Sequence, residues 1–399
     1  MTSEVIIMNK NAITIASDST VTVGNNKTYT GVNKIFMLSN NPPMGIMIFG
    51  SPNFENIPLE ALISEFSKIT NFKEPPDIIS IKDDFLDFLG KKTPSTDLHS
   101  KMESEFENFK MDFTPEIKSR NIDDLMVFLD ALQIALPSFL KDYKDIINQF
   151  DDEFKQMIPN HIPSEFHDEI ITKLKNIYLN RIIRMGTGIA IAGFSEKDMF
   201  PSVVTFNIVL NNNKKIEITD YDELLNYPES AIIPFAQQDV INTLITGIDN
   251  NIEIFLIDYF NTFIHSIIDD LKDEFSNNNK IDNNALSDIN NIMDTFEKTS
   301  NKRTEDFKKT IITIKEDVSD PFVDSFAVLP KEELAKMSES LIHITALKRK
   351  IDSNLKTVGG DINVAIISKV DGFIWIKHAN HFDNKLNPHF FDRKLRHVI

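Results

Sequence analysis

The chain has 399 residues, of which 41% are hydrophobic and 10% aromatic, and this composition excludes an intrinsically disordered protein. Lysine and arginine number 42 against 60 aspartates and glutamates, giving a formal net charge of -18, so we expect neither nucleic acid nor an anionic membrane surface as a partner. Cysteine is absent, which excludes disulfides, thiolate metal sites and a cysteine nucleophile.

Strands are predicted over residues 3 to 50. The segments EVIIM, AITIAS, KIFML and GIMIFG are short, rich in β-branched residues and bounded by Asn, Gly or Pro. They predict a compact antiparallel start. No basic region followed by a long apolar run opens the chain, so no signal peptide is expected, and we expect a cytoplasmic protein.

The pattern then becomes helical from about Leu59 to Arg184, with apolar residues at helical spacing and several prolines between segments. We assign residues 55–180 to a helical layer that carries an insertion. Strands return at TGIAIAGF, SVVTFNIVL and KKIEITDY, which favour a meander.

Helices are expected again from PFAQQDVINTLITGI onward. The apolar segment IEIFLIDYFNTFIHSIIDDL is interrupted by Asp258, Asn261 and His265, so it indicates a buried or partner-facing helix rather than a membrane span. The charge-dense region from Asp270 to Asp320 predicts exposed helices or a mobile insert.

A last helix and a closing strand pair follow. We therefore divide the remainder into a second helical insertion at 250–325 and a closing region at 326–399, all within one domain over 1–399. Because strands and helices are segregated along the chain, the fold class is expected to be α+β, with antiparallel sheets packed against helical layers.

The N-terminal strands bring one set of chemically useful residues into register. Asp18 follows Thr2 by 16 positions, and Lys34 follows Asp18 by 16. Strands of about seven residues return the chain to the same end of a sheet, so the three positions can meet. A chain-terminal Thr carries an α-amine of reference pKa near ~8 that can act as its general base, while Lys stabilises the alkoxide and Asp holds the Lys. Singly, each residue is better explained as a terminal residue, a turn former or a surface charge.

On these residues the stretch from Thr2 to Gly50 resembles proteasome β subunits and their bacterial and archaeal relatives, the N-terminal-threonine (Ntn) hydrolases. The resemblance implies an αββα sandwich with helical insertions, Thr2 as nucleophile after removal of Met1, Asp18 as partner of Lys34, and Lys34 as electrostatic helper. It also implies that the backbone N–H of Gly50 binds the oxyanion, although Gly50 comes two residues later than is common in the family.

Weaker similarity continues at IAIAGFSEKDMFPSVVTF, at AKMSESLIHITALKRKID and at TVGGDINVAIISKVDGFIWI. The family's Gly-Ser-Gly turn is replaced by IIPFAQ, which contains Pro234. The hydroxyl nearest the closing glycines is Thr357, which we assign as a supporting residue.

The first hypothesis for function is therefore a threonine-type peptidase that acts on peptide or protein substrates and assembles as a homo-oligomer. An ATPase or another partner could bind through the helical insertions. Two alternatives stay open: a catalytically silent assembly subunit, and an amidase acting on a small amide. No cofactor is expected. His378 and His381 have the spacing of a metal motif, but they and the later His389 and His397 are better explained as surface histidines, so no metal is expected.

Overall fold

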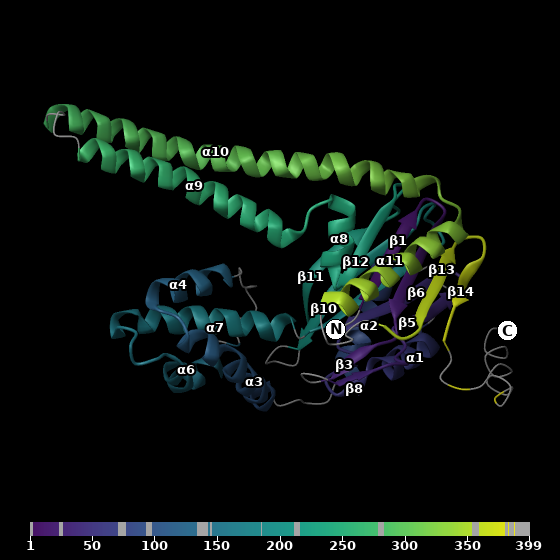
Figure 1. Ribbon diagram of the computed structural model, residues 1–399. Coiled ribbons are helices and arrows are strands. Elements are labelled where there is room, and N and C mark those ends of the chain that lie inside the picture. The colour runs from purple at the N-terminus through teal and green to yellow at the C-terminus, as the bar shows by residue number, and fades with distance from the viewer. Residues whose placement is uncertain are drawn as a thin grey trace.

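Two antiparallel five-stranded sheets form the centre of the protein, as a computed structural model shows (Figure 1). The structure describes residues 3–23, 27–70, 77–92, 98–133, 143, 146–184, 186–210, 216–277, 283–352, 359–379, 382 and 387. Helices pack on both sheets, and two helical additions extend away from them. The predicted α+β class with antiparallel sheets is confirmed.

The first sheet has the strand order β12-β1-β2-β13-β14. Its strands are β1 (Ser3–Asn9), β2 (Ala12–Asp18), β12 (Ala231–Ala236), β13 (Ile362–Ser368) and β14 (Gly372–Lys377). The three central strands, β1, β2 and β13, are buried along their whole length. Side chains alternate between the faces of a strand, so complete burial means that both faces of this sheet are covered.

The second sheet has the order β11-β10-β9-β6-β5. Its strands are β5 (Ile35–Asn40), β6 (Pro43–Gly50), β9 (Thr187–Gly193), β10 (Ser202–Leu210) and β11 (Ile216–Leu224). Two short hairpins accompany the sheets: β3 (Val21–Val23) with β4 (Lys27–Tyr29), and β7 (Asn53–Phe54) with β8 (Ile57–Pro58).

The two sheets pack face to face through a shared apolar layer that includes Ile6 and Ile15 of the first sheet and Met47 and Ala190 of the second. Separate apolar clusters lie on the outer faces. The helices that contribute to them are α1 (Leu59–Ile69) and α2 (Ile78–Lys92) on the second sheet, and α8 (Gln238–Thr246) and α11 (Lys331–Asp352) on the first. The sandwich thus holds β1, β2 and β13 rigidly between layers.

One predicted boundary was wrong. The sequence indicated helix from Pro234, whereas β12 extends to Ala236 and α8 begins at Gln238. Pro234 lies opposite Val5 of β1. A proline is tolerated there because β12 is an edge strand, whose outer side has no neighbour to which an N–H must donate.

The first helical addition has its own apolar core. It comprises α3 (Leu98–Lys118), α4 (Ile122–Ala131), α6 (Asp151–Met157), α7 (His167–Arg184) and the short 3₁₀ turns Asn148–Phe150 and Ser164–Phe166. Phe106 lies at the centre, with ring centroids 4.7 Å from Phe150 and 5.3 Å from Tyr178. The Tyr178 hydroxyl donates to the carbonyl of Met102, which closes the cluster.

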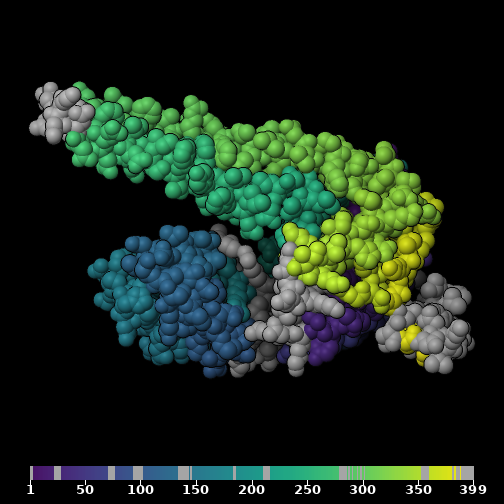
Figure 2. All heavy atoms as spheres, in the orientation of Figure 1, coloured from purple at the N-terminus to yellow at the C-terminus, as the bar shows by residue number. Residues whose placement is uncertain are grey.

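The second addition is a long antiparallel hairpin of α9 (Asn250–Ser276) and α10 (Asn283–Asp324), which projects from the sandwich in Figures 1 and 2. Its seam contains the stacked rings of Phe260 and Phe307, with centroids 4.3 Å apart, and the 2.7 Å ion pair of Lys315 with Glu253. The 3₁₀ turn Ser325–Val328 connects α10 toward α11. Of the two alternatives for this region, exposed helices are the one observed.

Within the described ranges, no helix taken singly is long and apolar enough to cross a membrane. Helices α8 and α9 reach that length and composition only as a pair, and they are bent by 67° relative to each other.

Candidate active site

Asp18 is the centre of the candidate site. It is the last residue of β2, where the strand leaves the buried first sheet, and it is fully buried. One carboxylate oxygen, Oδ1, accepts the backbone N–H of Ser3 at 3.1 Å, and the other, Oδ2, accepts the backbone N–H of Gly359 at 3.0 Å. Charged hydrogen bonds of this kind hold a carboxylate in one orientation.

Lys34 contacts Asp18 directly. Its Nζ lies 2.5 Å from Asp18 Oδ1, and only 3% of the residue is exposed. The backbone fixes this position, because the carbonyl of Lys34 accepts the N–H of Ile48 from β6 at 2.9 Å. The structure therefore brings together Asp18 and Lys34, which the sequence predicted to meet.

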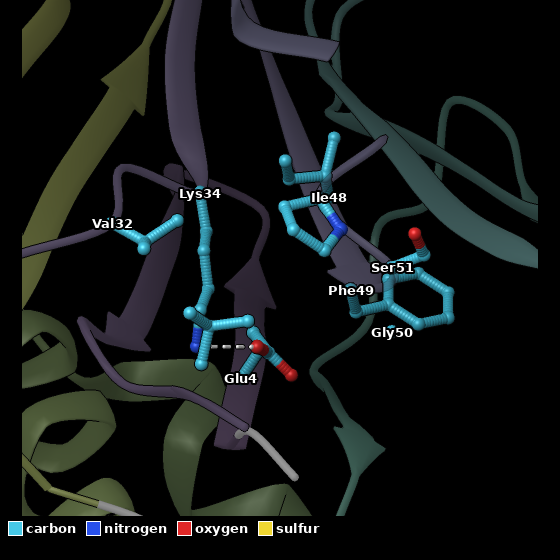
Figure 3. A pocket seen from close by; sticks show the side chains of 9 residues that line it. Glu4, Val32, Lys34, Ile48, Phe49, Gly50 and Ser51 are labelled. Atoms are coloured by element: carbon cyan, nitrogen blue, oxygen red, sulfur yellow. Dashed lines mark ion pairs between the residues drawn. The ribbon is translucent and has the colours of Figure 1, made fainter. Parts of the chain in front are cut away.

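A second carboxylate, Glu4, also contacts Lys34, and the sequence reasoning missed it. Glu4 Oε1 lies 3.1 Å from Lys34 Nζ, and Glu4 is fully buried in β1 (Figure 3). Its signal in the sequence is a lone acidic residue within the apolar run EVIIM. Such a residue in a buried strand needs a charge partner, because an isolated buried charge is very costly.

The closing glycine pair also belongs to the site. Besides the donation from Gly359 to Asp18, the Thr20 hydroxyl donates to the carbonyl of Gly359 at 2.5 Å. Gly360 has φ +74, and a Cβ there would lie 2.5 Å from the Ser19 hydroxyl oxygen. Only glycine fits this close approach, so Gly359 and Gly360 can lie directly against the end of β2.

Gly50 ends β6 at the rim of a small pocket of about 10 Å³, which is room for about one water molecule. It has φ +79 and lies opposite Thr187 in the sheet register. The pocket is lined by charged and apolar residues together, and Figure 3 shows Glu4 and Lys34 on one side and Ile48, Phe49, Gly50 and Ser51 on the other. The oxyanion role assigned to Gly50 stays a prediction.

Thr2 and Thr357, the other two predicted catalytic residues, lie outside the described residues. The described chain begins at Ser3, whose backbone nitrogen is the atom bonded to Thr2 and is also the donor to Asp18. His381, His389 and His397 lie outside the described residues too. His378 is described, and its ring stacks on Trp375 with centroids 4.2 Å apart.

Buried serines are the chain neighbours of the two carboxylates, Ser3 next to Glu4, and Ser17 and Ser19 next to Asp18. Ser3, Ser17 and Ser19 are each at most 2% exposed, and their hydroxyl oxygens have no hydrogen-bond partner among the described residues. Native proteins leave few buried polar groups unsatisfied, and each one calls for an explanation such as strain, a catalytic role or an ordered water. The sequence signal was the polar run SDST after an apolar strand.

No group of three or more His, Asp or Glu side chains with the arrangement of metal ligands occurs in the described part of the chain. The cluster at Asp18 instead contains two carboxylates and an ammonium. Such a cluster can stabilise a developing negative charge through Lys34.

Comparisons with known proteins found likeness only among solved structures, because no protein-family model and no curated protein matches this chain. An Anbu Gly-1 mutant from Hyphomicrobium sp. strain MC1 is 9% identical, with 100% of this chain and 98% of that chain covered and a TM-score of 0.36. Anbu, described as an ancestral beta-subunit, from Yersinia bercovieri is 7% identical, with coverage of 99% and 95% and a TM-score of 0.33. The Anbu complex from Pseudomonas aeruginosa, solved as a helical assembly, is 7% identical, with coverage of 99% and 96% and a TM-score of 0.36.

These findings correct the identification of the chain as a proteasome β-subunit-like Ntn hydrolase. No family model supports it, and the structures found are Anbu proteins at TM-scores of 0.33 to 0.36, which carry no conclusion about activity. The physical reason is that each interval of 16 residues spans a hairpin, β1 with β2 in the first and the shorter β3 with β4 in the second, and a hairpin returns the chain toward its starting point. Strand geometry produces such spacings without common ancestry.

Proposed function

We propose that this protein is a threonine-type amide-bond hydrolase that cleaves peptides, with Thr2 as nucleophile once Met1 has been removed. The observation that carries the proposal is the buried contact of Lys34 with both Asp18 and Glu4, next to the Ser3 amide. Asp18 binds the nitrogen atom to which Thr2 is joined, so the predicted nucleophile is covalently attached to an atom of the charged cluster.

The reaction begins with attack of the Thr2 hydroxyl oxygen on the carbonyl carbon of the substrate amide. The hydroxyl proton passes to the Thr2 α-amine, whose reference pKa of about 8 suits a base at neutral pH. When the C–N bond breaks, that proton goes to the leaving nitrogen. An ester on Thr2 remains, and water hydrolyses it with the same amine as base.

Lys34 supplies positive charge where the alkoxide develops. Asp18 keeps the ammonium in place from 2.5 Å, and burial strengthens the effect because little water screens it. Gly50, at the rim of the pocket, is assigned to the oxyanion through its backbone N–H.

The described residues that line the pocket all lie between positions 4 and 52. Val21, Val32 and Ile48 form its apolar lining next to Lys34. None of these lining residues belongs to the helical additions, so we assign the additions no part in the chemistry.

Substitution of Lys34 tests the proposal. Lys34→Arg keeps the positive charge and the ion pairs but moves the charge to a wider, planar group, so the fold is expected to persist while acylation slows at least ~100-fold. The measurement is hydrolysis of a panel of fluorogenic peptide amides by the full chain, with circular dichroism to check folding. Thr2→Ala should abolish turnover, and turnover that survives Thr2→Ala would refute the proposal.

A further inference from the structure

Helix α9 carries an exposed apolar stripe that adjoins its seam with α10. The stripe consists of six residues at helical spacing, each between 40% and 62% exposed. They are Ile252 (53%), Phe255 (62%), Tyr259 (59%), Phe263 (49%), Ile267 (42%) and Leu271 (40%). The seam residues Phe260 and Ile268 face α10 instead. The apolar arc of α9 is therefore wider than the part that α10 covers.

The aromatic part of the stripe forms an ordered ladder. The rings of Phe255 and Tyr259 have centroids 5.9 Å apart at an interplanar angle of 23°, and those of Tyr259 and Phe263 are 6.1 Å apart at 11°. Rigid aromatic side chains of this kind lose little conformational entropy on binding, and they are enriched at the centres of protein interfaces.

We propose that this stripe pairs with the same stripe of a second copy of the chain, antiparallel about a two-fold axis, so that two hairpins form a four-helix bundle. The area is sufficient. The six exposed fractions together equal about three whole large side chains, or roughly 600 Å² per copy. A stable interface buries from roughly 1,200 Å² in total, or roughly 600 Å² per partner.

Charge selects the antiparallel arrangement. The C-terminal end of α9 bears four exposed acidic residues, Asp269, Asp270, Asp273 and Glu274. A parallel pair would place the two acidic ends side by side, where like charges repel, whereas an antiparallel pair separates them by the length of the helix. The two-fold axis then lies between Tyr259 and Phe263, so that Tyr259 of each copy faces Phe263 of the other.

A protein surface of this chemistry is favoured over a lipid surface. The chain has a net charge of -18, and the acidic end of α9 lies next to the stripe, which disfavours an anionic bilayer. An isologous pair needs only one self-complementary patch, which the stripe provides.

The first experiment measures the mass of the full chain by sedimentation equilibrium. For the wild type we expect a mass of twice 45.6 kDa, or of another even number of chains. In Phe263→Lys the pairing should be at least ~30-fold weaker, so the mass should fall to half. The matched control is Ile254→Lys. Ile254 is 50% exposed on the same helix but lies nine residues from Phe263, hence on the opposite face, so its substitution should leave the mass unchanged.

The second experiment uses the absence of cysteine from the chain. Ile252→Cys and Leu271→Cys variants, co-expressed and oxidised, should form a disulfide between position 252 of one copy and position 271 of the other. A disulfide between two copies of Ile252→Cys would overturn the antiparallel arrangement. If the wild type has the mass of a single chain, pairing is overturned. Pairing is also overturned if the wild type floats with phosphatidylcholine vesicles and Phe263→Lys does not.

Discussion

At the scale of single residues, the two carboxylates that contact Lys34 have different roles. Asp18 accepts two backbone N–H groups and the Lys34 ammonium, and Glu4 forms an ion pair with Lys34. Asp18 therefore joins three segments of the chain: the start of β1, the residue before β5, and the loop that precedes β13.

We accordingly predict that Asp18→Asn lowers the free energy of unfolding by about 3 kcal/mol or more, because it leaves Lys34 less well paired in a buried site. Glu4→Gln keeps the shape of the side chain and leaves Asp18 to pair with Lys34, so its cost should be clearly smaller. Urea unfolding followed by circular dichroism measures both. Equal losses for the two variants would show that Asp18 has no special structural role.

The sequence allowed Asp18 and Lys34 to be placed at one end of a sheet, because the length of a strand fixes which residues share an edge, whereas Gly50 was assigned from the family resemblance alone. It did not reveal Gly359, which is 341 positions from Asp18. A contact between distant segments depends on how β13 pairs with β2, and no local pattern encodes that pairing. Glu4 was missed because the alternation of side chains along β1 does not show which face of the strand lies toward Lys34.

At the scale of secondary structure elements, helix α2 has a pH-sensitive start. The Asp77 carboxylate accepts the backbone N–H of Ser80 at 2.7 Å and its hydroxyl at 2.9 Å, which is the geometry of an N-cap. The donation from the Ser80 backbone, assisted by its hydroxyl, holds the pKa of Asp77 below the ordinary value of 3.8. The ionised form therefore stabilises the folded state.

We predict that Asp77→Ala lowers the free energy of unfolding by about 1 kcal/mol at pH 7. The contribution of the charge is fully present above the unfolded-state pKa and is lost as pH falls through the lower folded-state pKa. Asp77→Asn retains the cap without the charge, so it should lose less at pH 7. Thermal unfolding between pH 2 and pH 7 tests this, and an equal deficit for Asp77→Ala at both ends would contradict the pH dependence.

Most strands and helices could be predicted from periodicity, and the exceptions have physical causes. β12 was missed because Pro234 normally ends a strand, and only its edge position makes it acceptable. The lengths of α9 and α10 could not be read from their weakly periodic sequence, since pairing with each other, rather than local propensity, stabilises them.

At the scale of the whole molecule, the sandwich and the helices α3 to α7 have separate cores, since the apolar cluster around Phe106 contains no residue of either sheet. Phe106 is 1% exposed there, and Phe85 of α2 is fully buried in the apolar cluster between α2 and the second sheet. The helices α3 to α7 can therefore unfold locally while the two sheets stay folded.

Phe106→Ala is expected to destabilise α3 to α7 by about 3–5 kcal/mol and to speed amide hydrogen exchange there while β1 and β2 stay protected. Phe85→Ala is the matched control, and it should speed exchange in the sandwich. Hydrogen exchange read by mass spectrometry distinguishes the two. If Phe106→Ala exposed β1 and β2 as strongly as α3, the whole chain would unfold as one cooperative unit.

The central claim is that an uncovered Thr2 reacts beside Asp18 and Lys34. Its most direct test is the intact mass of the full chain before and after treatment with a peptide epoxyketone, which reacts with both the hydroxyl and the α-amine of a terminal threonine. We predict a chain that lacks Met1 and gains one adduct, with no adduct on Thr2→Ala and much slower labelling of Lys34→Arg. A chain that retains Met1, or one that lacks Met1 yet gains no adduct, would contradict the claim.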